Sequence, residues 1–466
     1  MKKKTGLFTI ITCVLLAIMV VTWLVPASYF TGSELSELGM YRIGFFDFFQ
    51  LIFGAFEFDY FNQIIILLLM IGAFYGVLGK TGKYRALTEK IASKFKGKEK
   101  AFLIGSSLII ALLTSTFDFN LITFIFIPAI ISIILDMKYD KNTAFMATFG
   151  AYLVGIIGST ISYNIVVTIN TVLKDVVLSD GIWFKIAMFV VSYALLAIYL
   201  VKQEKKAIKE DSAEDLFVGE EIHNKYPAWP IILIFSILFV LMILGCVNWN
   251  SVFGVTVFDD LMTKITSWTV GKNDTALASI ILGNVSAFGK WYYAEMGLMC
   301  LFASLIIGAI YKLGLRNTFD AMLEGIKKMV PIAGIVVLVY TVVYFTGNTM
   351  SYPTIAGWIL GATSKFNLLF ASIATILGSF LHVDMLYVSN YVVAQVAANT
   401  TNHALVGLLV QSLYGLTMFI VPTSAMLVLG LSYLNIPYKE YVKKNWMFIV
   451  ELLIAIFVVL LLAALI

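Results

Sequence analysis

Charged residues are scarce in this 466-residue chain, where they make up 13% of the sequence against 60% for hydrophobic residues. The mean hydropathy is +0.93. A soluble chain of this length has no core large enough to hide so much apolar surface, which excludes a water-soluble protein. The net charge of +4 is small and spread over several loops, so the chain also lacks the concentrated basic face that a nucleic-acid partner requires. We therefore predict that most of the surface of the protein contacts the lipid bilayer.

Cysteine and histidine are also rare, with three residues of each type. Cys13, Cys246 and Cys300 lie far apart in apolar runs, without the close spacing of a metal or redox site, so we expect them to pack as small hydrophobic side chains. The sequence contains neither a Gly-x-Gly-Asp nor a His-Glu-x-x-His run, and His382 two positions before Asp384 is a weak signal for catalysis. We therefore predict a protein that is not an enzyme and has no organic cofactor.

Long apolar runs are abundant. The first, Leu7 to Val25, follows the basic N-terminus Met1-Lys2-Lys3-Lys4 and is longer than the hydrophobic region of a secretory signal peptide, so it is interpreted as an uncleaved first transmembrane helix. Several later runs have the wrong length for a single crossing of the bilayer. The later runs lie near residues 60–79, 100–136, 143–173, 182–203, 229–248, 290–312, 330–346, 366–398, 403–435 and 444–466.

The basic loops between these runs predict the topology, because lysine and arginine accumulate on the cytoplasmic side of membrane proteins. If every basic loop is cytoplasmic, the segments 100–136 and 366–398 must each enter and leave the membrane on one side. They are then re-entrant hairpins, with tips near Ser115 to Asn120 and Ser379 to Asp384. The predicted fold is an all-α polytopic membrane protein with nine transmembrane helices, two re-entrant hairpins and a cytoplasmic N-terminus. The basic loops are Lys2–Lys4, Lys80–Lys100, Lys138–Lys141, Lys202–Lys209, Lys312–Arg316 with Lys327 and Lys328, and Lys439–Lys444.

Two stretches of the chain carry the same polar interruptions at the same spacing. Ser115 precedes Gly158-Ser159-Thr160 by 43 residues, and Ser379 precedes Pro422-Thr423-Ser424 by 43, so the chain contains a repeat offset by 264 residues. On the predicted topology the first hairpin opens from the cytoplasm and the second from outside, which makes the repeat an inverted one. An inverted pair of units with broken helices is typical of a secondary transporter.

The repeat divides the chain into four parts. They are a first inverted repeat (1–203, with the hairpin 100–136 and a broken helix 143–173), a cytoplasmic linker (204–228), a connecting helix with an external segment (229–289) and a second inverted repeat (290–466, with the hairpin 366–398 and a broken helix 403–435). Phe45–Phe56 and Arg316–Met329 alternate apolar with polar residues ahead of corresponding spans, so both are expected to lie along the membrane interface.

Irregular backbone marks the candidate site. In hydrocarbon an unpaired amide costs several kcal/mol, so broken helices are tolerated only where they are buried in protein or line a cavity. Hydroxyls, freed carbonyls and carboxylates suit Na⁺, and the amide groups at half-helix N-termini suit an anionic group of a substrate. The candidate substrate-binding residues are Ser115, Thr116, Asp118, Asn120, Ser162, Asn164, His382, Asp384, Thr423 and Ser424, and the candidate Na⁺ ligands are Ser115, Thr116, Ser159, Thr160, Ser379 and Thr423.

Each of these residues also has a purely structural explanation. Serine and threonine in membrane helices commonly bond their own i−4 carbonyl or pack against a neighbouring helix. Asp118 and Asp384 differ, because a carboxylate at bilayer depth costs about 2.5 to 3.5 kcal/mol and needs a compensating partner. His382 is either a proton carrier or a neutral ring hydrogen-bonded within the hairpin, with Asp384 as its partner. His403 is expected at the outer surface.

Short motifs spread over most of the chain are those of a known family. They are Trp23-Leu24-Val25-Pro26-Ala27, Lys80-Thr81-Gly82 and, above all, Val421-Pro422-Thr423-Ser424 followed by Ile436-Pro437-Tyr438 and Trp446. These motifs resemble the YfcC-like branch of the C4-dicarboxylate anaerobic carrier family, which belongs to the ion transporter superfamily and is similar to the p-aminobenzoyl-glutamate transporters. The resemblance implies nine crossings, two hairpins, a homodimer and cation-driven uptake or exchange. The protein is expected in the bacterial cytoplasmic membrane, with transport by elevator-type alternating access.

The residues that face the presumed substrate depart from the pattern of that family. Asp118-Phe119-Asn120 stands where Gly-Glu-Glu is usual, and Ser162-Tyr163-Asn164 stands where Asn-Pro-Phe is usual. The three arginines all fall in loops or at interfaces, so no guanidinium group is available at mid-membrane to clamp a dicarboxylate. The favoured function is Na⁺-coupled transport of a small amino acid or carboxylate. The alternatives are a basic amino acid antiporter, a proton-coupled carrier, a C4-dicarboxylate carrier and a passive channel.

Overall fold

The structure is a computed structural model that describes residues 6–31, 34–204, 216–217, 226–270, 275–276, 280–281, 283, 286–363, 365–398 and 400–465. Nearly all regular structure in these residues is helical. The strands form two small antiparallel pairs, β1 (Ala27–Thr31) with β2 (Glu34–Gly39) and β3 (Thr269–Val270) with β4 (Thr275–Ala276). The prediction of an all-α polytopic membrane protein is confirmed, although it did not include these short strands. Most of the predicted linker 204–228 lies outside the described residues.

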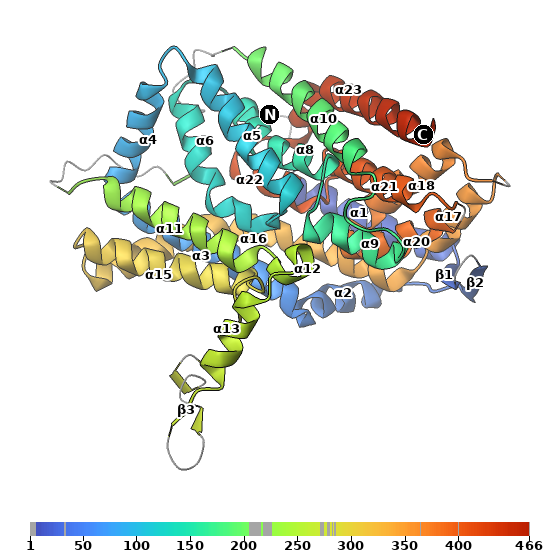
Figure 1. The fold of residues 1–466 in the computed structure, drawn as a ribbon, viewed down its shortest axis with the longest axis horizontal. Coiled ribbons are helices and arrows are strands. Elements are labelled where there is room, and N and C mark those ends of the chain that lie inside the picture. Colours follow the sequence, from blue (N-terminus) through green and yellow to red (C-terminus); the bar gives the residue numbers. More distant parts are fainter. Residues whose placement is uncertain are drawn as a thin grey trace.

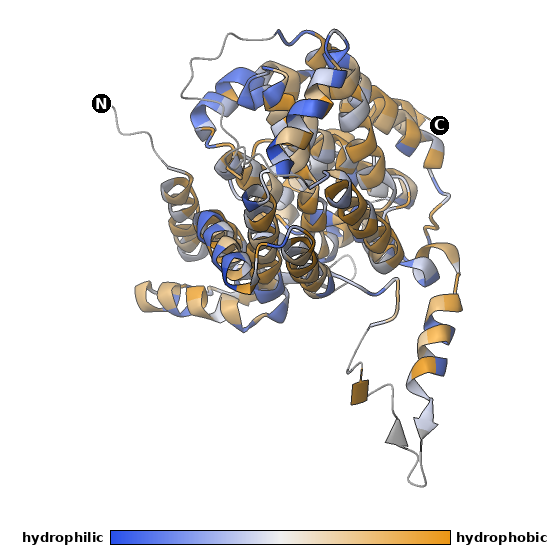
Figure 2. Ribbon diagram, turned by 90° about the vertical axis from the view of Figure 1, so that its left-hand side faces the viewer, coloured by the Kyte–Doolittle hydropathy of each residue, from blue (hydrophilic) through white to orange (hydrophobic). Residues whose placement is uncertain are grey.

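Eight helices in the described part of the chain are long and apolar enough to cross a membrane. One of them, α5, is an arm of the first predicted hairpin, whereas the two predicted broken helices consist of pieces too short to count separately. If α5 is taken as a hairpin arm and each broken helix as one crossing, the number is the predicted nine. Figure 2 shows hydrophobic residues along the helical body and hydrophilic residues gathered toward its ends. The eight helices are α1 (Leu7–Leu24), α3 (Asp59–Lys80), α5 (Glu99–Thr116), α10 (Ile182–Val201), α11 (Trp229–Cys246), α15 (Tyr293–Ile310), α16 (Leu315–Thr349) and α23 (Tyr438–Leu465).

The first predicted hairpin folds as α5, the short 3₁₀ helix η2 (Asn120–Ile125) and α6 (Ile127–Asp136). The chain turns after α5 because Asp118 and Asn120 both adopt positive φ angles, of 49° and 50°. Asp and Asn tolerate this left-handed conformation better than most residues, since their short polar side chains bond locally. Here the Asn120 amide donates to Asp118 Oδ1 at 3.2 Å. The tip therefore lies within the predicted range.

The second predicted hairpin folds as α18 (Leu368–Leu381), α19 (Met385–Val388), the π-helical turn η5 (Ser389–Val393) and α20 (Ala394–Ala397). Three residues separate α18 from α19. Asp384 caps α19, because its Oδ1 accepts a hydrogen bond from the Leu386 amide at 2.9 Å. Each hairpin tip thus carries an aspartate, placed by a left-handed turn in one copy and by helix capping in the other.

The helices that follow the hairpins are broken where the sequence predicts. In the first copy α7 (Lys141–Phe145), η3 (Met146–Gly150) and α8 (Ala151–Ile157) end at Gly158, and η4 (Tyr163–Val167) and α9 (Thr168–Leu173) resume the helix. A Cβ on Gly158 would lie 2.3 Å from the Cα of Phe189 in α10, so only glycine permits this approach. In the second copy the break separates α21 (His403–Met418) from α22 (Ala425–Tyr433), and it contains Pro422, which has no amide hydrogen to donate.

Corresponding helices of the two copies pack together. α3 packs along α16, and α8 packs along α21. α15 packs on α3, and α1 packs on α16 in the corresponding way. In Figure 1, α3, α15 and α16 lie together below the helices of the hairpins and the broken segments. We call α1, α3, α15 and α16 the scaffold helices, and we call the two hairpins and two broken helices, with α10 and α23, the hairpin group.

The two predicted interfacial segments differ in structure. In the first copy α2 (Phe45–Gly54) and η1 (Ala55–Glu57) are separated from α3 by Phe58. In the second copy the segment 316–329 is continuous with the span that follows it, so that α16 has 35 residues and a length of about 50 Å. The segment Arg316–Met329, expected along the membrane interface, is therefore part of the same helix as the span that follows it. Within this segment, Ala321 and Gly325 approach the backbone of Gly76 and Gly72 in α3, so this part of α16 packs along a helix of the scaffold.

The segment between α11 and α15 projects from the body. It contains α12 (Trp249–Phe253), α13 (Val257–Thr266) and the β3–β4 pair. Figure 1 shows α13 and β3 extending away from the other helices. This is the part of the chain that the sequence assigns to an external segment.

The first prediction concerns the crossing of α3 and α16. A Cβ on Gly325 would lie 2.0 Å from the Gly72 carbonyl oxygen, so Gly325→Ala should destabilise the protein by an amount near the upper end of the ~1–3 kcal/mol typical of overpacking. Gly334 is a matched control on α16, because a Cβ there meets nothing within 4 Å. Thermal unfolding in detergent should show a lower midpoint for Gly325→Ala only. Equal midpoints for the two variants would contradict this packing.

The second prediction concerns a contact between the copies at the loop before α7. The Asp140 carboxylate accepts hydrogen bonds from Lys444 Nζ at the start of α23 and from the Thr143 amide at 2.8 Å. Burial raises the pKa of Asp140, but the bonds from Lys444 and Thr143 outweigh burial and lower it from 3.8 to about 2. Because the folded pKa is the lower one, the stabilisation is complete above pH 4 and is lost as the pH falls from about 4 to 2.

Asp140→Asn should therefore lower the free energy of unfolding by about 1–2 kcal/mol at pH 7. The difference from the unsubstituted protein should shrink as the pH approaches 2. Unfolding midpoints of both proteins, measured at several pH values between 7 and 2, check this expectation. A gap that stays constant over that range would show that the charge of Asp140 is not its source.

Candidate functional site

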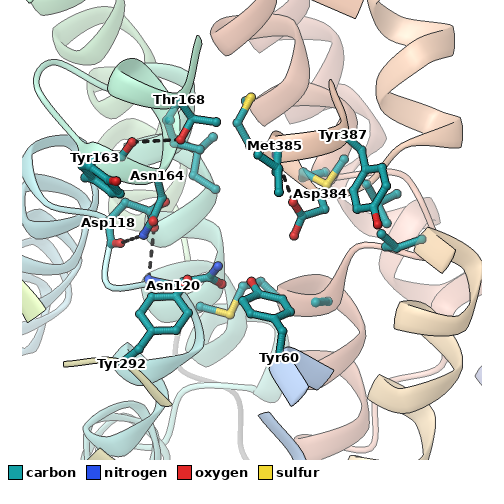
Figure 3. A pocket seen from close by; sticks show the side chains of 18 of the residues that line it. Tyr60, Asp118, Asn120, Tyr163, Asn164, Thr168, Tyr292, Asp384, Met385 and Tyr387 are labelled. Carbon is teal, nitrogen blue, oxygen red and sulfur yellow. Dashed lines mark hydrogen bonds between the residues drawn. The ribbon is translucent and has the colours of Figure 1, made fainter. Parts of the chain in front are cut away.

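A cavity of about 550 Å³ lies between the two hairpin tips. Its walls include residues of both tips, both breaks and two scaffold helices (Figure 3). The polar or charged lining residues among those described are Asp118, Asn120, Asn164, Thr168, Asn248, Lys290, Asp384 and Ser424, and the aromatic ones are Phe58, Tyr60, Phe61, Phe117, Tyr152, Tyr163, Trp291, Tyr292, Tyr340, Tyr387 and Tyr414. The predicted residues Asp118, Asn120, Asn164, Asp384 and Ser424 thus share one cavity.

The first hairpin supplies one wall. Asp118 is 3% exposed, and its Oδ1 accepts a hydrogen bond from the Tyr152 hydroxyl at 2.7 Å. Its carbonyl oxygen, freed by the left-handed turn, accepts a bond from Asn164 Nδ2 at 2.7 Å. The tip of the first hairpin is therefore held to both halves of the first broken helix, and Asp118 has a second carboxylate oxygen for which no hydrogen bond is seen among the described residues.

The second hairpin supplies the opposite wall. Figure 3 shows Asp384, Met385 and Tyr387 across the cavity from Asp118 and Asn164. The hydroxyl of Tyr414 in α21 donates to the Val383 carbonyl at 3.2 Å. In each copy, a tyrosine from the broken helix thus holds the tip of its own hairpin. The two aspartates face the same space from different repeats.

Tyrosines of the scaffold helices form a third wall, and sequence reasoning missed it. Tyr60 of α3 lies beside Tyr292, with ring centroids 6.0 Å apart, and beside Tyr340 of α16, at 6.1 Å. In Figure 3, Tyr292 and Tyr60 lie along the lower edge of the view, below Asp118 and Asp384. The signal in the sequence was the Tyr292-Tyr293 pair, but aromatic residues near the ends of membrane helices are common anchors and give no indication of a site.

Lys290 was also missed. It lines the cavity, its side chain is 62% exposed, and its Nζ lies 2.6 Å from Asp259 Oδ1 of α13. The three arginines were the cations weighed as substrate ligands, and all three fall in predicted loops or at interfaces. Among the described lining residues, the formally charged side chains are Lys290, Asp118 and Asp384.

Three of the hydroxyl residues predicted as Na⁺ ligands in the first copy, Ser115, Ser159 and Thr160, lie together but outside the cavity lining. Ser115 Oγ donates to the Gly158 carbonyl at 2.6 Å, and the Thr160 amide donates to the Ser115 carbonyl at 2.8 Å. The Ser159 carbonyl accepts a bond from Gln411 Nε2 of α21 at 2.8 Å. Thr116 does not join this cluster, because its hydroxyl bonds back to the Leu112 carbonyl at 2.8 Å, the structural alternative for a helical threonine.

The corresponding hydroxyls of the second copy are buried without partners. No described residue makes a hydrogen bond to Ser379 Oγ or Thr423 Oγ1, and the same is true of Ser162 Oγ in the first copy. None of these three lines the cavity. A buried hydroxyl without a partner is costly, so Ser379 and Thr423 are positions where a small ligand would restore lost bonds.

His382 lies away from the cavity. Its ring is 1% exposed, stacks on Tyr391 at a centroid distance of 4.9 Å and meets the edge of Tyr352. Neither ring nitrogen has a partner among the described residues, so the structure shows no bond between His382 and Asp384. The ring borders a second, water-sized cavity of about 10 Å³ beside Thr22 and Thr346.

His403, predicted at the outer surface, forms a hydrogen bond with Asp175. Its Nδ1 lies 2.8 Å from Asp175 Oδ1, and its side chain is 27% exposed. Cys246 lines the large cavity, whereas Cys300 is buried and Cys13 is exposed. In the described part of the chain, no group of three or more His, Cys, Asp or Glu side chains is arranged to hold a metal ion.

Comparison with solved structures gives a remote likeness. The YdaH transporter from Alcanivorax borkumensis, whose structure is described as revealing an unusual topology, aligns over 99% of this chain and 98% of its own, with 12% identity and a TM-score of 0.41. No curated protein matches the sequence.

Comparison with families gives a match over nearly the whole length. The profile described as DcuC, C4-dicarboxylate anaerobic carrier, matches residues 5–465, a range that contains both hairpins, both breaks and every residue of the cavity. The resemblance inferred from the short motifs is confirmed at the level of the family. The protein is a membrane transporter, and the chain belongs to the C4-dicarboxylate anaerobic carrier family.

Proposed function

We propose that the protein is a secondary active transporter that carries a small amino acid or carboxylate by elevator-type alternating access, without chemical conversion of its substrate. One observation carries the proposal: the tips and breaks of both copies contribute Asp118, Asn164, Asp384 and Ser424 to a single cavity. A site built at the meeting point of two inverted units can be exposed to either side of the membrane by moving one body against another. The homodimer and the location in the cytoplasmic membrane remain predictions.

The charges in the cavity favour a substrate that carries an ammonium group. Carriers of this family are described as C4-dicarboxylate carriers. A dicarboxylate would meet Asp118 and Asp384, and like charges repel strongly at low dielectric constant. An amino acid would place its ammonium group near these carboxylates and the faces of the tyrosine rings, where cation–π attraction adds to the ionic one. A basic amino acid, with a second cationic group, is the second candidate.

The packing supports a division into two moving bodies. The hairpin group is bonded within itself, by Tyr152 to Asp118, by Tyr414 to Val383 and, between the copies, by Gln411 to Ser159. The scaffold helices are packed backbone to backbone at Gly72 and Gly325. The substrate is proposed to move with the hairpin group, which carries both aspartates, past the tyrosine wall of the scaffold.

Na⁺ is the proposed coupling ion. The unpartnered hydroxyls of Ser379 and Thr423 support a cation site in the second copy, because a bound Na⁺ would take up oxygen atoms that the fold leaves free. In the first copy, Ser115, Ser159 and Thr160 are the proposed ligands. One Na⁺ moving through a potential of 100 mV and a tenfold gradient provides about 3.7 kcal/mol, enough for several-hundred-fold accumulation. Proton coupling is the alternative.

The third prediction concerns Asp118. Asp118→Asn should abolish substrate uptake or lower it at least tenfold, because it removes a charge that compensates a bound cation or ammonium group. The backbone should be unaffected, since asparagine tolerates the positive φ as aspartate does and can still accept the Tyr152 hydrogen bond. Asp384→Asn should behave similarly. Uptake into proteoliposomes, combined with the unfolding midpoint, checks both expectations.

The exposed Asp320 of α16 provides a matched control. Asp320→Asn makes the same change of charge on a scaffold helix outside the cavity and should leave uptake unchanged. Normal uptake with unchanged ion dependence in a well-folded Asp118→Asn protein would contradict the placement of the substrate at the first hairpin tip.

The fourth prediction concerns the coupling ion. Thr423→Val replaces a hydroxyl by a methyl group of similar size, so it should raise the Na⁺ concentration for half-maximal uptake at least tenfold. Thr375 is the matched control, since its hydroxyl is also buried without a described partner but lies in the middle of α18, away from the hairpin tip. Thr375→Val should change the Na⁺ dependence less than twofold. Uptake that is indifferent to Na⁺ and collapses with the pH gradient would exclude Na⁺ coupling.

A further inference from the structure

Among the described residues that line the cavity between the hairpin tips, Lys290 is the lysine. It is already paired with a carboxylate. Its Nζ lies 2.6 Å from Asp259 Oδ1, and the other oxygen of Asp259 accepts a bond from Asn250 Nδ2 at 3.1 Å. The Asp259 side chain is 25% exposed and that of Lys290 is 62% exposed, whereas Asp118 is 3% exposed. Lys290 therefore lies at the more open part of the cavity, and Asp118 lies in the more enclosed part.

The backbone that carries Lys290 is held firmly. The amides of Gly289 and Trp291 both donate to the Gly245 carbonyl at the end of α11, at 2.8 and 2.9 Å. The indole of Trp291 donates to the Ser286 carbonyl, and the Tyr292 amide donates to Glu295 at 2.9 Å. The turn is thus fixed from both ends, while the ammonium group sits on a flexible four-carbon chain. Lys290 can change its partner without any movement of the turn.

Asp259 comes from a different part of the fold. It lies in the first turn of α13, in the segment that projects from the body in Figure 1. An exposed pair of this kind contributes little to stability, so it exchanges readily for another carboxylate. Exchange with a carboxylate of a substrate would conserve the charge pairing of Lys290.

We infer that Lys290 binds the carboxylate of the entering substrate. When the cavity is empty, the carboxylate of Asp259 pairs with Lys290 instead. The inference rests on the proposed function and adds the orientation of the substrate: the carboxylate toward Lys290 at the open end, and the ammonium group toward Asp118 and Asp384. Asp259 is then an internal competitor that must be displaced for binding. Lys290 is accordingly a determinant of specificity that selects for carboxylate-bearing compounds.

The test compares ligands that differ only by the α-carboxylate. L-lysine is paired with cadaverine and L-leucine with isoamylamine, and binding to the full-length protein in detergent is measured by thermal shift and by isothermal titration. Lys290→Gln should weaken the binding of an amino acid at least tenfold and that of its amine less than twofold. Lys290→Arg, which keeps the charge, should bind the amino acid within threefold of the unsubstituted protein.

Removal of the competitor should act in the opposite direction. Asp259→Asn should strengthen the binding of the amino acid at least threefold and should not strengthen that of the amine. Asp260→Asn is the matched control, because Asp260 is exposed beside Asp259 on the same helix α13 and its replacement removes the same negative charge. It should alter neither affinity by more than twofold.

The outcomes separate the inference from the function on which it rests. Amino acid binding that is unchanged in Lys290→Gln, or that is lost together with amine binding, would overturn the role of Lys290 and leave the proposed transport intact. Absence of binding of all four compounds to both the unsubstituted protein and Asp259→Asn would overturn the proposed substrate class and the inference together.

Discussion

Backbone groups released by a broken helix must find partners inside the protein, because the hydrocarbon of a bilayer offers none. This constraint organises the centre of the molecule. The freed carbonyls of Gly158 and Asp118 are taken up by the side chains of Ser115 and Asn164, and the Val383 carbonyl is taken up by Tyr414. The bonds that satisfy the breaks are therefore the same bonds that hold the hairpin tips in place. At Ser379 and Thr423 no described residue supplies a partner, and both hydroxyls stay without a hydrogen bond.

The scaffold helices depend on close packing. Gly72, Gly76 and Gly325 bring α3 and α16 into backbone contact, in the way that small residues allow in membrane helices. The scaffold formed in this way carries Tyr60 and Tyr340 and holds them against the hairpin group. The cavity consequently combines a rigid aromatic wall with two carboxylates that belong to the hairpins. This combination is the basis of the proposal that the substrate is cationic or zwitterionic, and membership of the family does not by itself identify the substrate.

Much of the fold was predictable because the signals are local. A long apolar run, a basic loop and a proline or glycine at a fixed spacing are each readable without knowledge of the partners they meet. The hairpin 100–136, the break at Gly158 and the break at Pro422 all lie where these signals place them. The continuity of α16 was not predictable, because the amphipathic pattern of 316–329 suits an interfacial helix equally well, and its contact with α3 decides between the two.

The sequence by itself determined the membrane class, the repeat and the candidate residues at the tips, since hydropathy and spacing are properties of the chain alone. Only the tertiary structure decided which candidates share a cavity. Asp118, Asn164 and Asp384 do, whereas Ser115 closes a break and His382 packs among tyrosines. Lys290 and the tyrosine wall come from segments that carry no motif, and they acquire their place only when α3, α15 and α16 pack beneath the hairpins. The physical reason is that a binding site is a set of contacts between distant segments, and those contacts depend on packing geometry that no local pattern encodes.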